Sequence, residues 1–105
     1  QINIGNEETK GGFEYEDGLD ACRKIAAMPA LKVKGLMAML PFTDDEAVLR
    51  PLAKKMRALY DALRGEMDGI EYLSMGMSGD WKLCVECGSN MVRLGTSIFG
   101  VRHYN

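Results

Sequence analysis

The chain has 105 residues, of which 47% are apolar and 27% charged, and its formal net charge is −2. This is the composition of a globular domain and excludes a disordered tail. Charges of both signs are interspersed, without the clustered basic face that nucleic acid requires. No apolar run approaches the ~20 residues of a membrane span, and the first residues lack the basic segment of a signal peptide. Three cysteines, an odd number, and eight methionines suit a reducing cytoplasm better than a disulfide framework.

The chain opens on a segment with the pattern of a buried strand, residues 1–4, and no initiator Met precedes it. Because a natural chain rarely begins inside an element, we expect this sequence to be a fragment of a longer protein. The polar, glycine-containing residues 5–12 then predict a loop. A helix is predicted over residues 15–28 and is stopped by Pro29. Its apolar face comprises Leu19, Cys22, Ile25 and Ala26.

A second strand is predicted over residues 33–39, which are nearly all apolar, as expected of a parallel strand covered on both faces. In the turn that follows, Thr43 and Asp44 are the candidate caps of the next helix. Pro51 is expected in the first turn of that helix, where its missing N–H costs nothing, and Gly65 at its end. The apolar residues at helical spacing in it are Leu52, Met56, Leu59, Tyr60 and Leu63.

The last elements are a strand over residues 70–75, a helix over 79–87 with Gly88 as its C-cap, and a strand over 91–94. Strands that alternate with helices predict a parallel sheet with right-handed crossovers. Four such βα units make either half of a (β/α)8 barrel or a small open α/β sheet. A half-barrel has two unpaired sheet edges and an exposed apolar face, so we expect it to associate with a partner, such as a second copy of itself.

Two of the predicted strands run into glycine-containing turns that precede helix starts, in residues 74–80 and 93–100. Side by side, these turns gather backbone N–H groups, the hydroxyls of Ser78 and Thr96, and the guanidinium of Arg93. Such donors suit a phosphate, and the phosphate site of a (β/α)8 barrel lies after strands seven and eight. The sequence therefore predicts phosphate-binding loops here, at what would be the C-terminus of a barrel. The alternative is an ordinary loop whose side chains only cap a helix.

A set of segments, taken in order, carries a resemblance to a known family. The two most specific are Ser-Met-Gly-Met-Ser at residues 74–78 and Arg-Leu-Gly-Thr at residues 93–96, preceded by residues 1–4, 9–11 and 34–37. Together they resemble the YggS/PROSC family of pyridoxal phosphate homeostasis proteins, single-domain barrels similar to the N-terminal barrel of alanine racemase. The resemblance covers essentially this whole chain but only the C-terminal half of a family member. It implies an α/β fold: the C-terminal half, about four βα units, of a (β/α)8 barrel.

The resemblance also implies a site for pyridoxal 5′-phosphate. Met77 and Ser78, after strand seven, would bind the phosphate of the cofactor, and Gly95 and Thr96, after strand eight, would bind its other side. Arg93 would lie beneath the cofactor, facing either the pyridine nitrogen or the phosphate. An arginine at the ring nitrogen keeps that nitrogen unprotonated and weakens the ring as an electron sink, which suits a carrier without forbidding catalysis.

Further residues are expected around the same cofactor. Ser74 belongs to the first phosphate-binding segment, and Met37 lies near a strand end where, with Met75 and Met77, it could wall the flat ring. The methionines expected as core filler are Met28, Met56 and Met67.

One part of the family's site has no counterpart in this chain. The Schiff-base lysine of the family lies at the end of the first barrel strand, in the half that this chain lacks. Lys10 also follows a strand, but its Thr-Lys-Gly turn matches strand five of the family. The resemblance therefore implies a phosphate half-site without the covalent anchor.

Cys84 and Cys87 form a CxxC pattern, which is typical of zinc or redox sites. The pattern lies inside a predicted helix and has no second CxxC, and only Cys22 and His103 could complete a metal site. We therefore favour a packing role for the cysteines, expect no metal, and expect a solvated His103.

The leading hypothesis is a non-catalytic protein that binds pyridoxal 5′-phosphate and buffers or delivers it, with phosphate or sulfate as simpler ligands. The enzymatic alternative is an alanine-racemase-like racemase or decarboxylase, although no second domain follows strand eight in this sequence. A third hypothesis is a structural fragment that binds no ligand and self-associates as a half-barrel. None of the three involves nucleic acid or a membrane.

Overall fold

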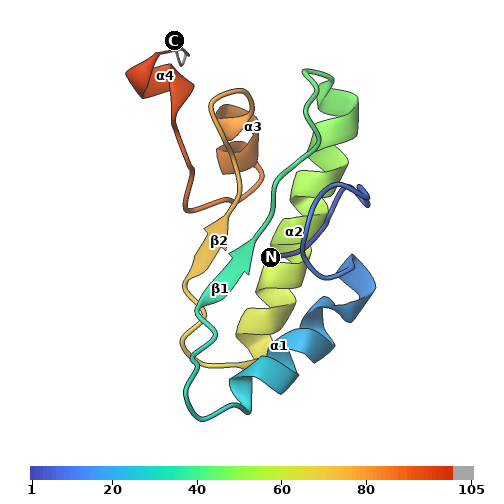
Figure 1. Ribbon diagram of the computed structural model, residues 1–105, viewed down its shortest axis with the longest axis vertical. Coiled ribbons are helices and arrows are strands. Elements are labelled where there is room, and N and C mark those ends of the chain that lie inside the picture. The colour runs from blue at the N-terminus through green and yellow to red at the C-terminus, as the bar shows by residue number, and fades with distance from the viewer. Residues whose placement is uncertain (101–105) are drawn as a thin grey trace.

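The computed structural model describes residues 1–100 of the chain. Strands alternate with helices along it, as the sequence predicts, and the α/β class is confirmed (Figure 1). The elements in chain order are a 3₁₀ turn at Tyr15–Asp17, α1 at Gly18–Ala26, β1 at Gly35–Met37, α2 at Glu46–Glu66, β2 at Tyr72–Ser74, α3 at Trp81–Glu86 and α4 at Thr96–Phe99.

The two regular strands, β1 and β2, pair in parallel with Gly35 opposite Tyr72 and Met37 opposite Ser74. Gly35 is required at this point, because a Cβ there would collide with the carbonyl oxygen of Tyr72. The carboxyl ends of both strands point toward α3 and α4 (Figure 1).

The first and last predicted strands are present only as single bridges beside this pair. Ile2 bridges Ala38 and donates its N–H to Met37 at 2.8 Å, while Met91 bridges Ser74 on the far side. All of these bridges are parallel, so the predicted parallel arrangement holds for all four segments, although only the middle two form regular strands. Each outer segment has a strand on one side only, which leaves little to hold it in an extended ladder.

The first helix is shorter than predicted. The Tyr15–Asp17 turn replaces its beginning, and α1 ends at Ala26, so Met28 falls outside the helix and is 49% exposed. The prediction of Met28 as core filler is therefore wrong. The residue before a proline is disfavoured in helical conformation, and Met28 precedes Pro29, which explains the early end.

The second helix differs from its prediction at both ends. Asp45, and neither Thr43 nor Asp44, caps α2, since its Oδ1 accepts from the N–H of Ala47 at 2.9 Å. This start places Pro51 in the second turn rather than the first. The helix also continues through Gly65 to Glu66.

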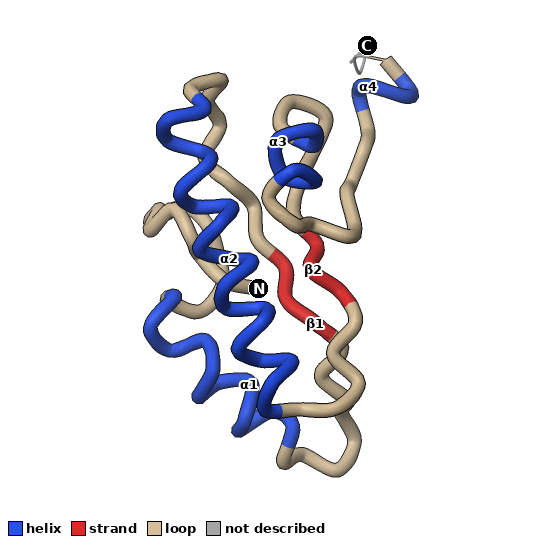
Figure 2. Tube along the Cα trace, turned by 180° about the vertical axis from the view of Figure 1, so that it is seen from behind, coloured by secondary structure: helices blue, strands red, loops and turns tan. Residues whose placement is uncertain are grey.

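The core lies between α2 and the strands, with α3 closing one end. Figure 2 shows α1 and α2 on one side of β1 and β2. The largest fully buried side chains are Met56, Leu63, Leu73, Met75 and Cys84, contributed by α2, β2 and its following residue, and α3. Within residues 1–100, no helix combines the length and the apolar character needed to cross a membrane.

Candidate functional site: a cavity at the carboxyl ends of the strands

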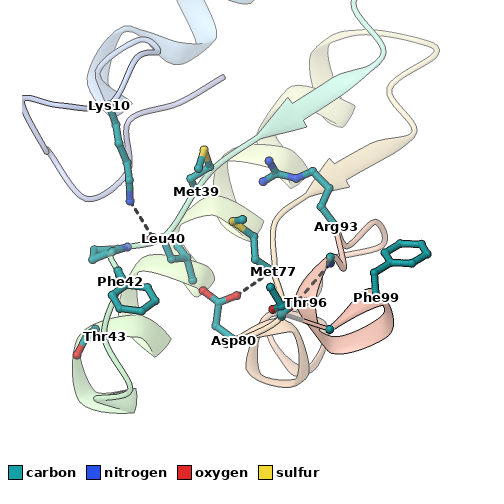
Figure 3. A pocket seen from close by; sticks show the side chains of 15 residues that line it. Lys10, Met39, Leu40, Phe42, Thr43, Met77, Asp80, Arg93, Thr96 and Phe99 are labelled. Atoms are coloured by element: carbon teal, nitrogen blue, oxygen red, sulfur yellow. Dashed lines mark hydrogen bonds between the residues drawn. The ribbon is translucent and has the colours of Figure 1, made fainter. Parts of the chain in front are cut away.

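A cavity of about 750 Å³ lies where the strands end (Figure 3). Its walls come from three loops that follow strand segments, residues 39–43, 77–80 and 93–100, together with Lys10. Loops at the carboxyl ends of parallel strands converge on one edge of the sheet, which is where α/β proteins bind their ligands. The size is within the range of small-molecule sites.

The loop after β2 is a tight turn closed by Met77 and Asp80. The carbonyl of Met77 accepts from the N–H groups of Asp80 at 3.2 Å and Trp81 at 3.0 Å. The N–H of Met77 in turn donates to Oδ1 of Asp80 at 2.7 Å (Figure 3). The amide of Met77, which the resemblance suggested as a phosphate donor, is thus already paired within the chain. The N–H groups of Ser78 and Gly79 have no partner among the described residues.

Ser78 connects the two predicted phosphate-binding loops. Its Oγ accepts from the N–H of Gly95 at 3.3 Å and from the N–H of Ser97 at 3.1 Å. With two N–H donors on the oxygen, the proton of the hydroxyl remains available to an outside acceptor. The N–H of Thr96, between these two residues, makes no hydrogen bond within residues 1–100.

Arg93 enters the cavity from the segment after Met91. Its backbone N–H donates to Gly76 at 2.8 Å, which fixes the residue beside the β2 loop. Nη2 of its guanidinium donates to the carbonyl of Ala38 at 3.1 Å, and Nε is buried without a partner in the described part of the chain. A buried, unpaired donor on a charged group is costly unless a ligand satisfies it. Arg93 lines the cavity, and its Nε is an unpaired donor that lies beneath the cavity surface.

Lys10 lies on the opposite wall of the cavity. Its Nζ donates to the carbonyl of Leu40 at 2.9 Å and forms an ion pair with Glu7 at 2.7 Å. Figure 3 shows the side chain reaching down toward the loop after β1.

The cavity brings together most of the residues that the sequence singled out. Those that line it are Met77, Ser78, Arg93, Gly95 and Thr96. Ser74 and Met37 lie within β2 and β1 and do not line the cavity, so their roles remain predictions. The sequence reasoning did not place Met39 or Phe42 at the site, and it gave no binding role to Asp80 or Phe99 within the two predicted loops; all four line the cavity. The position of residues 39–43 directly after a predicted parallel strand was the signal that could have found that wall.

The three cysteines are buried, which supports the packing role predicted for them. Cys22, Cys84 and Cys87 are all buried and unbonded, and residues 1–100 contain no cluster of three or more side chains suited to a metal. Burial, followed by the charge of Asp80, raises the pKa of the Cys84 thiol to about 12, so this thiol stays protonated near neutral pH. His103 lies outside the described residues.

The profile of one family, described as "Alanine racemase, N-terminal domain", matches residues 1–103. The chain belongs to this family. It is similar to the pyridoxal phosphate homeostasis protein of Aquifex aeolicus, with 40% identity over 105 residues, 99% of this chain and 46% of that protein. The protein of the same name from Escherichia coli strain K12 is 37% identical, over 100% of this chain and 45% of its own length. These relatives confirm the resemblance found in the sequence, and the chain spans about half their length.

Solved structures are also similar to this chain. PipY of Synechococcus elongatus without PLP matches with a TM-score of 0.84 and 27% identity, over 95% of this chain and 47% of PipY. PipY with PLP bound matches with a TM-score of 0.75 and 28% identity, over 88% of this chain and 44% of PipY. The crystal structure of an unknown protein from Bifidobacterium adolescentis matches with a TM-score of 0.88 and 32% identity, over 93% of this chain and 40% of that protein.

Proposed function

We propose that this chain, as a single partial domain, is the C-terminal half of a (β/α)8 barrel and binds the phosphate end of pyridoxal 5′-phosphate in the cavity. Similarity to homeostasis proteins and to a PLP-bound PipY supports the choice of cofactor. The observation that carries the proposal is the set of unused donors around one cavity. These donors are the N–H groups of Ser78, Gly79 and Thr96 and the Ser78 hydroxyl proton. The guanidinium of Arg93, whose buried Nε is unpaired within residues 1–100, lines the same cavity.

The residues present fit the chemistry of this cofactor. A phosphate accepts several hydrogen bonds, and the Ser78–Gly79 and Gly95–Thr96 segments supply neutral donors from two loops that Ser78 already ties together. Arg93 adds a permanently charged donor. Met39 and Met77 supply the soft apolar walls that a flat ring needs, and both line the cavity.

Each residue has a distinct task in this proposal. Ser78 and Thr96 hold the phosphate, Arg93 places a cation beneath the cofactor, and Met77 excludes water from the ring. Bound pyridoxal phosphate supplies an aldehyde that reacts reversibly with amino groups. The lysine that the family uses for that reaction has no counterpart here, so this chain contributes retention and orientation while the covalent anchor lies elsewhere in the longer protein.

We propose that the longer protein buffers or delivers the cofactor rather than catalysing a reaction with it. The names of the relatives favour this role, and an arginine at the pyridine nitrogen would weaken the ring as an electron sink. The family match itself favours the alternative, a racemase-like enzyme, for which a second catalytic residue would have to come from outside these residues.

A pyridoxal phosphate titration of this chain, followed by absorbance, tests the proposal. We expect saturable binding, and no borohydride-stable adduct in a peptide mass map. Because Arg93 offers a charged donor, Arg93→Ala should weaken binding at least about tenfold, and Thr96→Val should weaken it by a smaller factor. Arg64→Ala is the matched control, since Arg64 lies on the exposed face of α2.

Two outcomes would contradict the proposal. A stoichiometric adduct at Lys10 would move the reactive site to the opposite wall. Absence of binding by the wild-type chain would favour a ligand-free structural fragment.

We also propose that the half-barrel associates with a second copy of itself. Val92 and Leu94 make no backbone hydrogen bonds within the described residues, although their neighbours Met91 and Arg93 bond to the β2 side. In a parallel strand, alternate residues bond to opposite sides, so the outer side of this segment is an open edge.

A further inference from the structure

Asp80 makes a contact at the cavity that neither helix capping nor solvation explains. It is the N-cap residue of α3, the place where a carboxylate usually accepts an N–H from the first turn of the helix. Its side chain makes no such bond. Oδ1 accepts instead from the N–H of Met77, three residues earlier, at 2.7 Å.

This contact determines which amides of the loop remain free. Both backbone groups of Met77 are engaged, the carbonyl by Asp80 and Trp81 and the N–H by the Asp80 carboxylate. The two residues between them, Ser78 and Gly79, keep N–H groups without a partner in the described chain, and both line the cavity. The short bond thus closes the turn on itself and leaves its two middle donors for an anion.

A carboxylate is an unexpected choice beside an anion site. Its negative charge repels phosphate. The same charge is also the second cause, behind burial, of the raised pKa of the neighbouring Cys84 thiol. A group with this electrostatic disadvantage must contribute through geometry, as a strong acceptor for one amide.

We propose that Asp80 is the positioning residue of the phosphate-binding turn: by accepting the Met77 N–H, it holds the Ser78 and Gly79 amides free and oriented for the phosphate. This inference rests on the proposed function of the cavity. It assigns to Asp80 a role as hydrogen-bond acceptor, in which its charge is dispensable.

The test compares Asp80→Asn with Asp80→Ala. The amide oxygen of Asn can accept the same N–H without the charge, whereas Ala cannot accept it. We expect Asp80→Ala to bind inorganic phosphate and pyridoxal phosphate about tenfold more weakly than Asp80→Asn, which loses the same charge, because only the Ala variant loses the bond that orients the turn. Asp80→Asn should bind both probes at least as tightly as the wild type. Asp68→Ala, an exposed site whose substitution makes the same change in net charge, should leave both affinities unchanged.

Amide hydrogen exchange, measured by NMR without ligand, is a second test. It distinguishes a local loss of the Met77 hydrogen bond from a general loss of stability. The Met77 amide should be protected in the wild type and in Asp80→Asn, and should exchange fast in Asp80→Ala. The amides of Cys84, in α3, and of Cys87, its C-cap, should stay protected in all three. Their N–H groups donate to Asp80 and Leu83 carbonyls, which both variants retain.

The outcomes separate the two proposals. If the wild type binds neither probe, the proposed function fails. If the wild type binds and Asp80→Ala binds equally well, only the positioning role is overturned. A loss in Asp80→Asn as large as that in Asp80→Ala would also overturn it, because charge rather than acceptor geometry would then decide. Fast exchange of the Met77 amide in the wild type would do the same.

Discussion

Single polar atoms distinguish this cavity from an ordinary loop cluster. The Nε of Arg93 is buried and unpaired within residues 1–100, although the same guanidinium bonds to Ala38 through Nη2. The hydroxyl oxygen of Ser78 accepts two hydrogen bonds from backbone amides of the second loop. Each residue thus keeps one unpaired donor, the Ser78 hydroxyl at the cavity and the Arg93 Nε beneath its surface. A buried donor without a partner destabilises the ligand-free state. This arrangement supports the proposed binding of an acceptor-rich ligand.

Cys84 gives the chain a pH dependence on the alkaline side. Burial and the charge of Asp80 both oppose the thiolate and raise the pKa of this thiol from its ordinary value of 9.0 to about 12 in the folded chain. Between these values the unfolded state has lost a proton that the folded state keeps, so rising pH favours unfolding. The contribution is fully present below about pH 9 and is lost as the pH rises toward 12.

We therefore expect the free energy of unfolding to fall above about pH 9 with a slope approaching about 1.4 kcal/mol per pH unit from this group alone. Urea unfolding at a series of pH values measures the slope. Cys84→Ala should lower stability by a constant amount and flatten that part of the profile. An identical alkaline slope in the variant would show that other groups dominate.

The candidate site could be predicted from the sequence only as far as the motifs place residues along the chain. Arg93 lies in the last predicted strand and Gly95 and Thr96 follow it, and all three line the cavity. Met37 and Met39 share a face of their strand because side chains alternate, but Met39 lies two residues nearer the carboxyl end and alone lines the cavity. The Asp80–Met77 bond was not predictable, because an Asp at this position more often caps the following helix.

At the scale of elements, substitution of two glycines tests the packing of β1 and α2, because one position has no room for a side chain and the other has open space. Gly35 lies against the Tyr72 carbonyl with no room for a Cβ, whereas Gly65 is on the open side of α2 with no neighbour within 4 Å of that position. Gly35→Ala should destabilise the chain by about 3 kcal/mol or more, because the two strands must separate. Gly65→Ala should stabilise it by about 0.5–1 kcal/mol through helix propensity.

Thermal unfolding of both variants, monitored by circular dichroism, measures these opposite shifts. A Gly35→Ala variant as stable as the wild type would mean that β1 and β2 do not pair with Gly35 opposite Tyr72.

Element boundaries are the part of the fold that local signals determine least. Thr43, Asp44 and Asp45 are consecutive candidate caps, and local chemistry alone does not choose among them. The choice of Asp45 moves Pro51 to the second turn, where α2 lacks one backbone bond and still continues. The buried face of α2, with Met56 and Leu63 fully buried, compensates for that loss. Periodicity therefore predicted which face is buried better than where the helix begins.

At the scale of the molecule, parallel order follows from alternation of strands and helices, and this was predictable. The shortness of the outer strands was not, because it depends on what lies beyond each edge. On one side, Phe13 covers Ile2 through a parallel bridge and through the bond from Asn3 N–H to its carbonyl at 2.8 Å. On the other side, no backbone group bonds to Val92 or Leu94 within residues 1–100. The described part of the chain thus protects one edge and exposes the other.

The open edge makes a specific prediction about association. A second copy can pair with the open edge at Val92 and Leu94. Two large apolar side chains that line the cavity, Phe42 and Phe99, are also strongly exposed. Sedimentation equilibrium of the wild-type chain should reveal reversible self-association at micromolar to millimolar concentration. Val92→Pro should shift it toward monomer, because proline removes the outward N–H while keeping an apolar side chain.

Arg93→Pro is the contrasting variant: it deletes the inward bond to Gly76 and should destabilise the fold itself. Two results would show that copies of the chain do not associate through this edge. One is a wild-type chain that stays monomeric at high concentration, and the other is a Val92→Pro variant that associates equally well.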